Sequence, residues 1–339
     1  MAQRITITDL ARITGFSKTT ISHVVNNTRG ARIRPETREL IQKAAREHNY
    51  VPNFFARNII RGKTRYLAFL THDLDEACRS GELLGVEQAC RAGGYHLMIA
   101  NAGGLDMSES QLVEELVQRG IEGLYADWLQ APLDALERFN QFGVHLALGD
   151  LPSGGIDADC VYSQTNQGLK TLADKLRELG HHSLILASTG RAAQSRFRVA
   201  AREALTGHGL SVREVQVNGP DRSSPLSWME TGPGAPSATA LVFLDGALAL
   251  GTLAGLLAQG RRVPQDLSLI VAGADADLGY ESPKLARLSW PARERGARAV
   301  ERLIQRAEGA TPQDLPHLSL GLTPTFFEGG SLGPPPQRA

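Results

Sequence analysis

The stretch from Thr6 to Asn27 constrains the fold more than any other part of the chain, because its residue order specifies two short helices and the turn between them. Thr6 can cap the first helix, and Asp9 at the third helical position completes a variant of the capping box. Gly15 stands where that helix must end, since only glycine enters the left-handed conformation without a steric penalty. Ser17 can then cap the second helix. We therefore predict a helix, a tight turn and a second helix.

Each of the two predicted helices has an apolar face and a polar face. Leu10 and Ile13 give the first helix an apolar stripe. In the second helix, Ile21, Val24 and Val25 face inward, whereas the outward residues are Lys18, Thr19, Ser22 and His23. These outward side chains are polar, short or basic, which suits a helix whose N-terminal half enters the major groove of DNA. The plain alternative is a helical hairpin that packs on another part of the protein.

A third helix is predicted to begin at Pro35, with Ile41, Ala44 and Ala45 on its inner face. Three helices of this kind can share one small core. This continuation favours a separate DNA-binding unit over a simple hairpin.

Residues 5 to 65 resemble the headpiece of the lactose repressor family of bacterial transcription regulators. The residues that carry the resemblance follow the order of the family pattern and are Asp9, Ala11, Gly15, Ser17, Thr20, Ser22, Asn26, Thr37, Arg38, Ile41, Tyr50, Pro52, Asn53 and Ala56. There are two departures: Thr14 stands where the family usually has alanine, and the loop from Thr28 to Arg34 is longer than usual.

The resemblance implies that the headpiece binds an operator in double-stranded DNA. The residues that we expect at the DNA are Thr6, Ser17, Lys18, Thr19, Thr20, Ser22, His23, Asn26, Arg29, Arg32, Arg34, Tyr50, Asn53, Ala56 and Ile59. Three of these, Arg29, Arg32 and Arg34, lie in the longer loop. They either form a solvated loop or add contacts to phosphate groups beside the recognition helix.

The segment from Tyr50 to Thr64 is too apolar for a free linker, and Pro52 and Gly62 can begin and end a short helix in it. One interpretation is that this helix packs on the body of the protein. The other is a hinge helix that folds on DNA and inserts an apolar wedge into the minor groove. The resemblance favours the hinge, because Ile59 takes the place of the family's intercalating leucine and Ala56 that of the small residue beside it.

Charge is distributed unevenly, although the formal net charge of the whole chain is zero. Through Arg65 the chain has thirteen Lys and Arg residues and four Asp and Glu residues, a net charge of about +9, so the remainder carries about −9. A basic head on an acidic body suits a protein whose head lies on a polyanion. This distribution supports DNA as the partner.

The cysteines and the apolar runs of the sequence indicate the cellular compartment of the protein. Cys78, Cys90 and Cys160 form no CxxC motif and no metal-ligand spacing, which fits a reduced cytoplasm. The N-terminal residues have no apolar signal core, and no run is long enough to span a bilayer. We therefore expect a cytoplasmic protein with no membrane partner, associated with the nucleoid when it is bound to DNA.

From Tyr66 onward the pattern changes to alternating strands and helices, which predicts a parallel, doubly wound α/β sheet. The predicted strands are 66–71, 95–101, 121–127, 144–150, 183–188, 212–217, 240–245 and 267–273, and the predicted helices are 83–92, 108–119, 133–142, 166–179, 191–205, 247–258 and 292–308. The pattern repeats after Cys160, which implies two similar halves, and the last helix is expected to return to the first half.

This layout resembles the periplasmic-binding-protein-like effector domain of the same family, and its better anchors are HLALGD, LADKLRELGH, LDGALALG and VPQDLSLI. The predicted fold class is α/β, with a helix-turn-helix headpiece followed by an effector domain of two doubly wound subdomains. The predicted limits are 1–50 for the headpiece, 51–64 for the hinge, 65–162 with 289–320 for the N-subdomain, 163–288 with 321–331 for the C-subdomain, and 332–339 for a flexible tail.

In such folds the ligand lies outside the carboxyl ends of the strands, here in the cleft between the halves. The residues that we expect at an effector are His72, Arg79, Asp150, Arg198, Asp245 and Asp275. The segment that ends at Arg79 lacks the family's ligand-stacking stretch, and Asp275 is a displaced stand-in for the family's usual aspartates. Asp150 and Arg198 lie near the family's usual positions, with Arg196 as an alternative to Arg198, and one hypothesis is that Arg198 and Asp245 face each other across the cleft. Asp245 replaces the usual asparagine. All six can equally be polar residues at strand ends.

No motif for catalysis stands out. The glycine-rich stretches CRAGGYHLMIANAGG and GTLAGLLAQG do not have G-x-G-x-x-G spacing between a strand and a helix. Neither a Walker sequence, a nucleophile elbow nor a metal motif occurs. The glycines in these helices are more simply close-packing residues. We therefore expect no enzyme, no metal and no cofactor.

The resemblance and the charge distribution together predict a sequence-specific DNA-binding transcription regulator. We expect a repressor that binds a palindromic operator as a homodimer and is controlled by a small-molecule effector, a carbohydrate or a related metabolite. Dimer contacts are expected from the apolar helices near 83–90 and 248–257, although these can equally be core, and the tail has no heptad for a tetramer. The alternatives are a ligand-binding protein with no DNA role and a regulator that has lost its effector response.

Overall fold

The structure is a computed structural model of the chain. The residues that it describes are 5–26, 32–50, 63–71, 74, 77–102, 109–126, 138–149, 157–189, 195–217, 238–273, 281–311 and 313–336, with the side chains of 77–79, 109–110 and 195–196 excepted. The chain divides into two compact units, Met1–Thr64 and Arg65–Ala339. Each unit is described by itself.

The described residues of the first unit form helices α1 (Ile7–Thr14), α2 (Lys18–Val25) and α3 (Pro35–Glu47). Their buried core consists of Leu10, Ile21, Val24, Ile41 and Ala44, as the apolar spacing of the sequence predicted. Ile13 is a correction, because it is 45% exposed and does not extend the apolar stripe of α1. Within α1, Leu10 is fully buried, and Ile7 and Ala11 pack partly buried against the same core.

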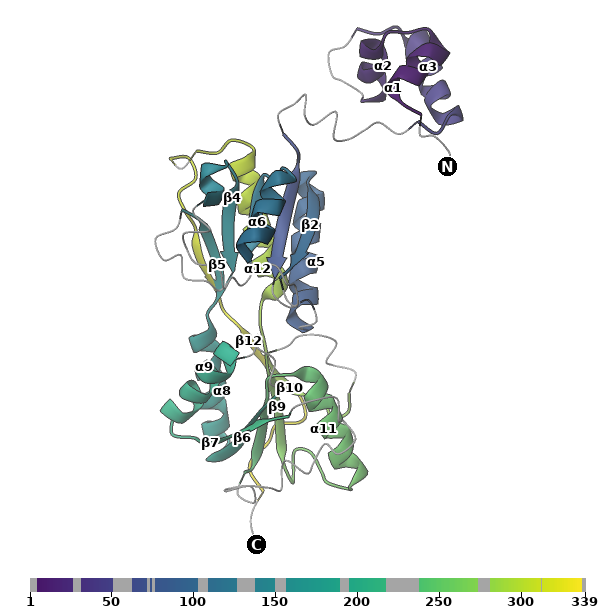
Figure 1. The fold of residues 1–339 in the computed structure, drawn as a ribbon. Coiled ribbons are helices and arrows are strands. Elements are labelled where there is room, and N and C mark those ends of the chain that lie inside the picture. Colours follow the sequence, from purple (N-terminus) through teal and green to yellow (C-terminus); the bar gives the residue numbers. More distant parts are fainter. Residues whose placement is uncertain are drawn as a thin grey trace. The chain divides into compact units, whose positions relative to one another are not determined.

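The second unit contains two six-stranded sheets (Figure 1). The first has the order β11-β5-β4-β3-β1-β2, and all of its paired strands are parallel. Its strands are β1 (Tyr66–Thr71), β2 (His96–Asn101), β3 (Gly123–Ala126), β4 (His145–Gly149), β5 (Asp159–Ser163) and β11 (Ser319–Leu322). Helices α5 (Ala77–Gly93) and α12 (Ala292–Ala307) cover one face, and α6 (Glu109–Gln118) covers the other.

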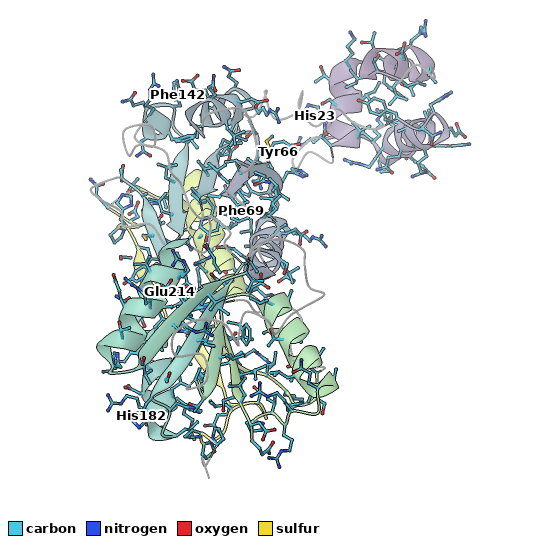
Figure 2. All side chains as sticks on the ribbon, turned by 60° about the horizontal axis from the view of Figure 1, so that its bottom comes forward. His23, Tyr66, Phe69, Phe142, His182 and Glu214 are labelled. Carbon is cyan, nitrogen blue, oxygen red and sulfur yellow. The ribbon has the colours of Figure 1, made fainter. Side chains whose placement is uncertain are left out.

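Successive side chains of β1 point alternately to the helices on the two faces of the first sheet. Leu67 and Phe69 pack in the cluster with α5 and α12, whereas Ala68 and Leu70 pack in the cluster with α6. Figure 2 labels Tyr66 and Phe69 on this strand. Because successive side chains of a strand point to opposite faces, a strand covered on both sides is apolar throughout.

The second sheet has the order β12-β10-β9-β8-β6-β7, in which only β12 is antiparallel to its neighbour. Its strands are β6 (Ser183–Ser188), β7 (Ser211–Gln216), β8 (Ala240–Phe243), β9 (Ser268–Ala272), β10 (Ala286–Ser289) and β12 (Thr325–Phe327). Helices α8 (Thr165–Glu178) and α9 (Ser195–Gly207) cover one face, and α11 (Gly246–Ala258) covers the other. Both sheets share the doubly wound order 2-1-3-4-5 for their first five strands.

The chain passes between the sheets three times: from β5 to α8, from β10 to α12 and from β11 to β12. The first and third crossovers are joined directly, since Gln164 donates its backbone N–H to Leu322 and accepts a hydrogen bond from the Thr323 hydroxyl. The sequence did not predict β5, β10, β11 or β12. These strands are three to five residues long and adjoin the crossovers, so their periodicity is too short to identify them.

The end of the described chain differs from the predicted flexible tail. Leu332 packs on the core of the second sheet, and the backbone N–H of Gly333 donates to the Ser268 hydroxyl at 3.1 Å. The Gly333 carbonyl accepts hydrogen bonds from Ser268 and from the ring of His181. Residues up to Gly333 are thus tied to the second sheet, while 337–339 lie outside the described residues.

Candidate DNA-binding and effector sites

The first helix of the headpiece begins at the predicted capping box. The Thr6 backbone N–H donates to Asp9 Oδ2 at 3.1 Å, and the Asp9 N–H donates to Thr6 Oγ1 at 3.3 Å. The hydrogen bonds from Thr6 stabilise the charged carboxylate and lower the pKa of Asp9. The entrance to α1 is therefore fixed by local contacts, and the Thr6 side chain lies exposed beside it.

The turn between α1 and α2 has the predicted geometry. Gly15 ends α1 with a φ of 73°, and its N–H donates to the Ala11 carbonyl at 2.9 Å. Ser17 then caps α2, because its hydroxyl accepts a hydrogen bond from the Thr20 N–H at 3.1 Å. The two caps fix the turn and so the direction in which α2 leaves it.

The N-terminal half of α2 presents polar side chains to solvent. Lys18 and Thr19 are exposed, whereas Ser22 and His23, labelled in Figure 2, are half-buried. Asn26 at the end of α2 donates to the Ser22 hydroxyl at 3.1 Å, and its buried Oδ1 has no hydrogen-bond partner within the described residues. This face offers both donors and acceptors, the groups that read base edges in a major groove.

The other residues expected at DNA fall into two groups. Arg32 and Arg34 are exposed just before α3, and Tyr50 is half-buried against the headpiece core. The remaining four lie outside the described residues and are Arg29, Asn53, Ala56 and Ile59. The DNA role of each of these residues stays a prediction.

Of the six residues expected at an effector, the structure describes the side chains of two. Arg198 at the start of α9 donates from Nη1 to the Glu214 carboxylate on β7, which also pairs with Arg202 at 3.1 Å. Asp245 caps α11 by accepting a hydrogen bond from the Leu248 N–H at 2.8 Å. The side chains of His72, Arg79, Asp150 and Asp275 lie outside the described part.

The hypothesis that Arg198 and Asp245 face each other across a cleft is wrong. Arg198 lies on the helix after β6 and Asp245 directly follows β8, and these two strands are neighbours in the second sheet. The two side chains therefore belong to one half of the effector unit. The predicted limits of the C-subdomain, 163–288, already contain both residues, so a cleft between the two subdomains cannot separate them.

Two further residues at strand ends were not predicted. Thr71 ends β1 and Ser188 ends β6, so both occupy the first strand of a doubly wound sheet, at its carboxyl end. Both hydroxyls are buried and have no hydrogen-bond partner within the described residues. Their backbone roles also match, since the Thr71 carbonyl accepts from Ala102 and the Ser188 carbonyl from Val217. The sequence signal was a single hydroxyl residue closing each apolar run, YLAFLT and SLILAS.

The carboxyl ends of the first and third strands are where doubly wound sheets bind ligands. Thr71, Ser188 and Asp245 all lie at such ends. A buried hydroxyl without a partner is costly, and a ligand can supply the missing hydrogen bond. The chain thus contains a helix-turn-helix unit and a doubly wound unit with candidate positions for a ligand. This combination is typical of regulators that respond to a small molecule.

Comparison with known proteins agrees with this class. Residues 6–53 match the bacterial regulatory proteins of the lacI family, and residues 173–332 match the periplasmic binding protein-like domain. The HTH-type transcriptional repressor PurR of Vibrio atlanticus (strain LGP32) is 27% identical over 319 residues, which cover 89% of this chain and 91% of that protein.

Solved structures share the fold at lower identity. A LacI family transcriptional regulator from Silicibacter pomeroyi has a TM-score of 0.80 at 20% identity, covering 97% of this chain and 99% of that one. The lac repressor dimer bound to operator and the anti-inducer ONPF has a TM-score of 0.77 at 20% identity, with the same coverage. The chain therefore combines a helix-turn-helix domain of the bacterial lacI regulatory family with a periplasmic binding protein-like domain. No helix within the described residues is long and apolar enough to cross a membrane.

Proposed function

We propose that this protein is a transcriptional repressor that binds a two-fold operator as a homodimer and releases or holds it according to a small-molecule effector. The observation that carries the proposal is the doubly capped turn at Gly15 with the exposed polar start of α2. A helix presented in this way can enter a major groove with its N-terminal residues foremost. Binding, and not catalysis, is the proposed activity.

Two-fold operators require two headpieces, and α11 offers a surface for the second copy. Its 13 residues include no charged side chain, and Leu250 and Leu257 are 37% and 43% exposed. The other exposed residues of the helix are small, namely Ala247, Gly251, Ala254 and Ala258. An uncharged exposed face of this kind favours close packing against a partner.

The dimer surface can be tested by sedimentation velocity. Leu250→Asp with Leu257→Asp should shift the dimer towards monomer, with a dissociation constant raised at least about tenfold, because each carboxylate must be desolvated in the interface. Phe142→Asp is the matched control, because Phe142 is an apolar residue that is 63% exposed and lies away from α11, just before β4 of the first sheet. Figure 2 labels Phe142. An unchanged dimer in the double variant would exclude α11 from the interface.

For the effector we propose an uncharged polyhydroxylated molecule, a carbohydrate or a related metabolite. Thr71 and Ser188 each provide a hydroxyl that donates and accepts, and Asp245 provides an acceptor, which is the chemistry that recognises sugar hydroxyls. Arg198 joins the site only if a ligand competes with Glu214 for its guanidinium. That pairing is also what favours the second candidate, a regulator of this fold that no longer responds to an effector.

The deciding experiment is a gel-shift assay with the purified protein on the DNA upstream of its own gene, followed by sequence enrichment of bound DNA. The expected result is a specific complex on a palindromic site, which a panel of sugars and related metabolites weakens or strengthens. A basic headpiece that binds all DNA alike would contradict the proposal. Specific binding that no metabolite alters would favour the second candidate.

A further inference from the structure

Arg65 is the first residue of the second unit, and its backbone adopts an unusual conformation. Among the described residues other than glycine, only Asn49 and Arg65 have a positive φ, and that of Arg65 is 58°. A side chain at this φ is disfavoured by its own Cβ, so the conformation persists only where surrounding contacts enforce it. The contacts around Arg65 are therefore informative.

The backbone of Arg65 is held on both sides. Its N–H donates to Glu122 Oε1 at 2.8 Å, and its carbonyl accepts from the His96 N–H at 2.8 Å. Glu122 precedes β3 and His96 begins β2, the two neighbours of β1 in the sheet. The chain is thus fixed one residue before β1 begins.

The Arg65 side chain adds a second set of contacts. Its Nη2 pairs with Glu308 Oε1 at 3.3 Å, and its guanidinium lies over the Tyr95 ring, 5.4 Å from the centroid. The Tyr95 hydroxyl donates to the same Glu308 oxygen at 3.0 Å, and burial raises the pKa of Tyr95, so the hydroxyl keeps its proton. Arg65, Tyr95 and Glu308 form one cluster, which we call the linker anchor.

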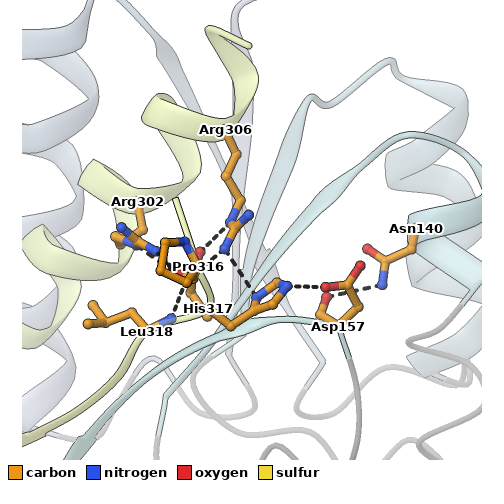
Figure 3. A network of polar contacts seen from close by, with 8 residues as sticks. Asn140, Asp157, Arg302, Arg306, Pro316, His317 and Leu318 are labelled. Atoms are coloured by element: carbon orange, nitrogen blue, oxygen red, sulfur yellow. Dashed lines mark hydrogen bonds and ion pairs between the residues drawn. The ribbon is translucent and has the colours of Figure 1, made fainter. Parts of the chain in front are cut away.

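The linker anchor is attached to a fixed element. Glu308 is the C-cap of α12, and two residues earlier Arg306 donates to both oxygens of the fully buried Asp159 at 2.6 and 3.1 Å. Arg302 donates to the same carboxylate, and Figure 3 shows this network with Arg306 also reaching His317. The end of α12 therefore cannot shift without breaking buried ion pairs.

We propose that Arg65 is a positioning residue for DNA binding, which sets the point and direction at which the chain leaves the effector unit towards the headpiece. This inference rests on the proposed function. In a dimer, two such fixed exits narrow the range of distances between the headpieces, and so favour one spacing of operator half-sites. An isolated surface ion pair would have no such effect on DNA choice.

The test compares variants on operators with different half-site spacings. The affinity of the wild-type protein is first measured on its selected operator and on versions of that operator with one or two base pairs inserted at the centre. Arg65→Ala and Glu308→Gln should each lower affinity for the native spacing about tenfold and reduce the discrimination between spacings, because the second headpiece loses effective concentration. Binding to non-specific DNA should be unchanged. Arg91→Ala is the control, since Arg91 is an exposed arginine that pairs with Glu87 on α5.

Arg65→Gly separates the backbone from the side chain. Glycine accepts the positive φ without strain but has no guanidinium. If the side chain positions the linker, Arg65→Gly loses the discrimination between half-site spacings, as Arg65→Ala does. Arg65→Gly should nevertheless melt at a higher temperature than Arg65→Ala, because glycine relieves the strain of the positive φ. Wild-type discrimination in Arg65→Gly, or in both Arg65→Ala and Glu308→Gln, would overturn the inference while leaving the proposed function intact. A wild-type protein that selects no operator would overturn both.

Discussion

His181 and His182 are adjacent in sequence but differ in burial. His181 is fully buried, with Nε2 2.8 Å from the Gly333 carbonyl and Nδ1 2.8 Å from the Thr239 hydroxyl. The carbonyl can only accept, so Nε2 carries the proton and neutral Nδ1 accepts from Thr239. His182, labelled in Figure 2, is exposed. Burial lowers the pKa of His181 from its ordinary 6.5.

This lowered pKa predicts a loss of stability in acid. Below pH 6.5 the unfolded chain binds a proton at His181 before the folded chain does, so the free energy of unfolding falls by up to about 1.4 kcal/mol per pH unit until the lower folded pKa is reached. Urea unfolding of wild type, His181→Asn and the matched control His182→Asn between pH 7.5 and 5 measures this. The slope should shrink only in His181→Asn. Equal slopes in all three proteins would exclude His181 as the group responsible.

Lys18 and Arg32 are both exposed cations, but they are expected to act on DNA differently. Lys18→Ala should cost about 1–3 kcal/mol on the specific operator and alter base preference at its contact, because a lysine at the start of α2 can reach base edges. Arg32→Ala should weaken all sequences alike and reduce the salt slope by about one. Sequence enrichment and salt titrations measure both effects. A binding-site logo that Lys18→Ala leaves unchanged would remove α2 from the role of recognition helix.

At the scale of elements, α5 and α12 are held together by close backbones and by a buried ion pair. A Cβ added at Gly296 would lie 2.6 Å from the Glu82 carbonyl oxygen, so only glycine fits where α12 meets α5. Arg295 donates to both carboxylate oxygens of Glu82 at 2.9 Å each, and to the Ser163 hydroxyl at 3.3 Å. Tyr125 donates to the same carboxylate. Of the glycines predicted to be close-packing residues, Gly93 fits the prediction, because a Cβ there would meet the Ile304 side chain. Gly251 does not, because a Cβ there would meet no other atom.

The buried pair predicts non-additive stability. Glu82→Leu alone should lower the free energy of unfolding by about 3–5 kcal/mol, because it leaves a buried guanidinium without its carboxylate. Glu82→Leu with Arg295→Leu should recover most of that loss, since neither charge is then buried. Arg298→Ala, which removes an exposed partner of Glu301, should cost less than about 1 kcal/mol. Thermal and urea unfolding measure the set. A double variant as unstable as Glu82→Leu would show that Arg295 contributes by packing and not by charge.

At the scale of the whole molecule, the residues proposed for DNA binding and those proposed for effector binding lie in separate units, so variants should separate the two activities. Ser188→Ala should weaken the effector response at least about tenfold, while operator affinity without effector stays within about twofold. Arg198→Ala should do the same where the ligand takes the guanidinium from Glu214. Asp245→Asn should act similarly but keep the cap on α11, because an asparagine oxygen also caps a helix. Effector titrations of the operator complex measure the response. Lowered melting temperatures with an intact response would assign these residues a structural role instead.

The sequence by itself determined the parts whose physical causes are local. The caps at Thr6 and Ser17 and the turn at Gly15 depend on hydrogen bonds and φ values within a few residues, so their order in the chain is sufficient to predict them. The alternation of apolar strands and helices likewise identified the α/β unit, because burial on both faces requires continuous apolar runs.

Only the tertiary structure decided which distant segments meet. The pairing of Arg198 with Glu214, the contact of Glu82 with Arg295 and the anchor of Arg65 on Glu308 all join residues from different elements. The short strands β5, β10, β11 and β12 are specified by the neighbours that they pair with, not by their own periodicity. Strand order sets these contacts, and strand order results from burying the whole core at once, which no local window of sequence contains.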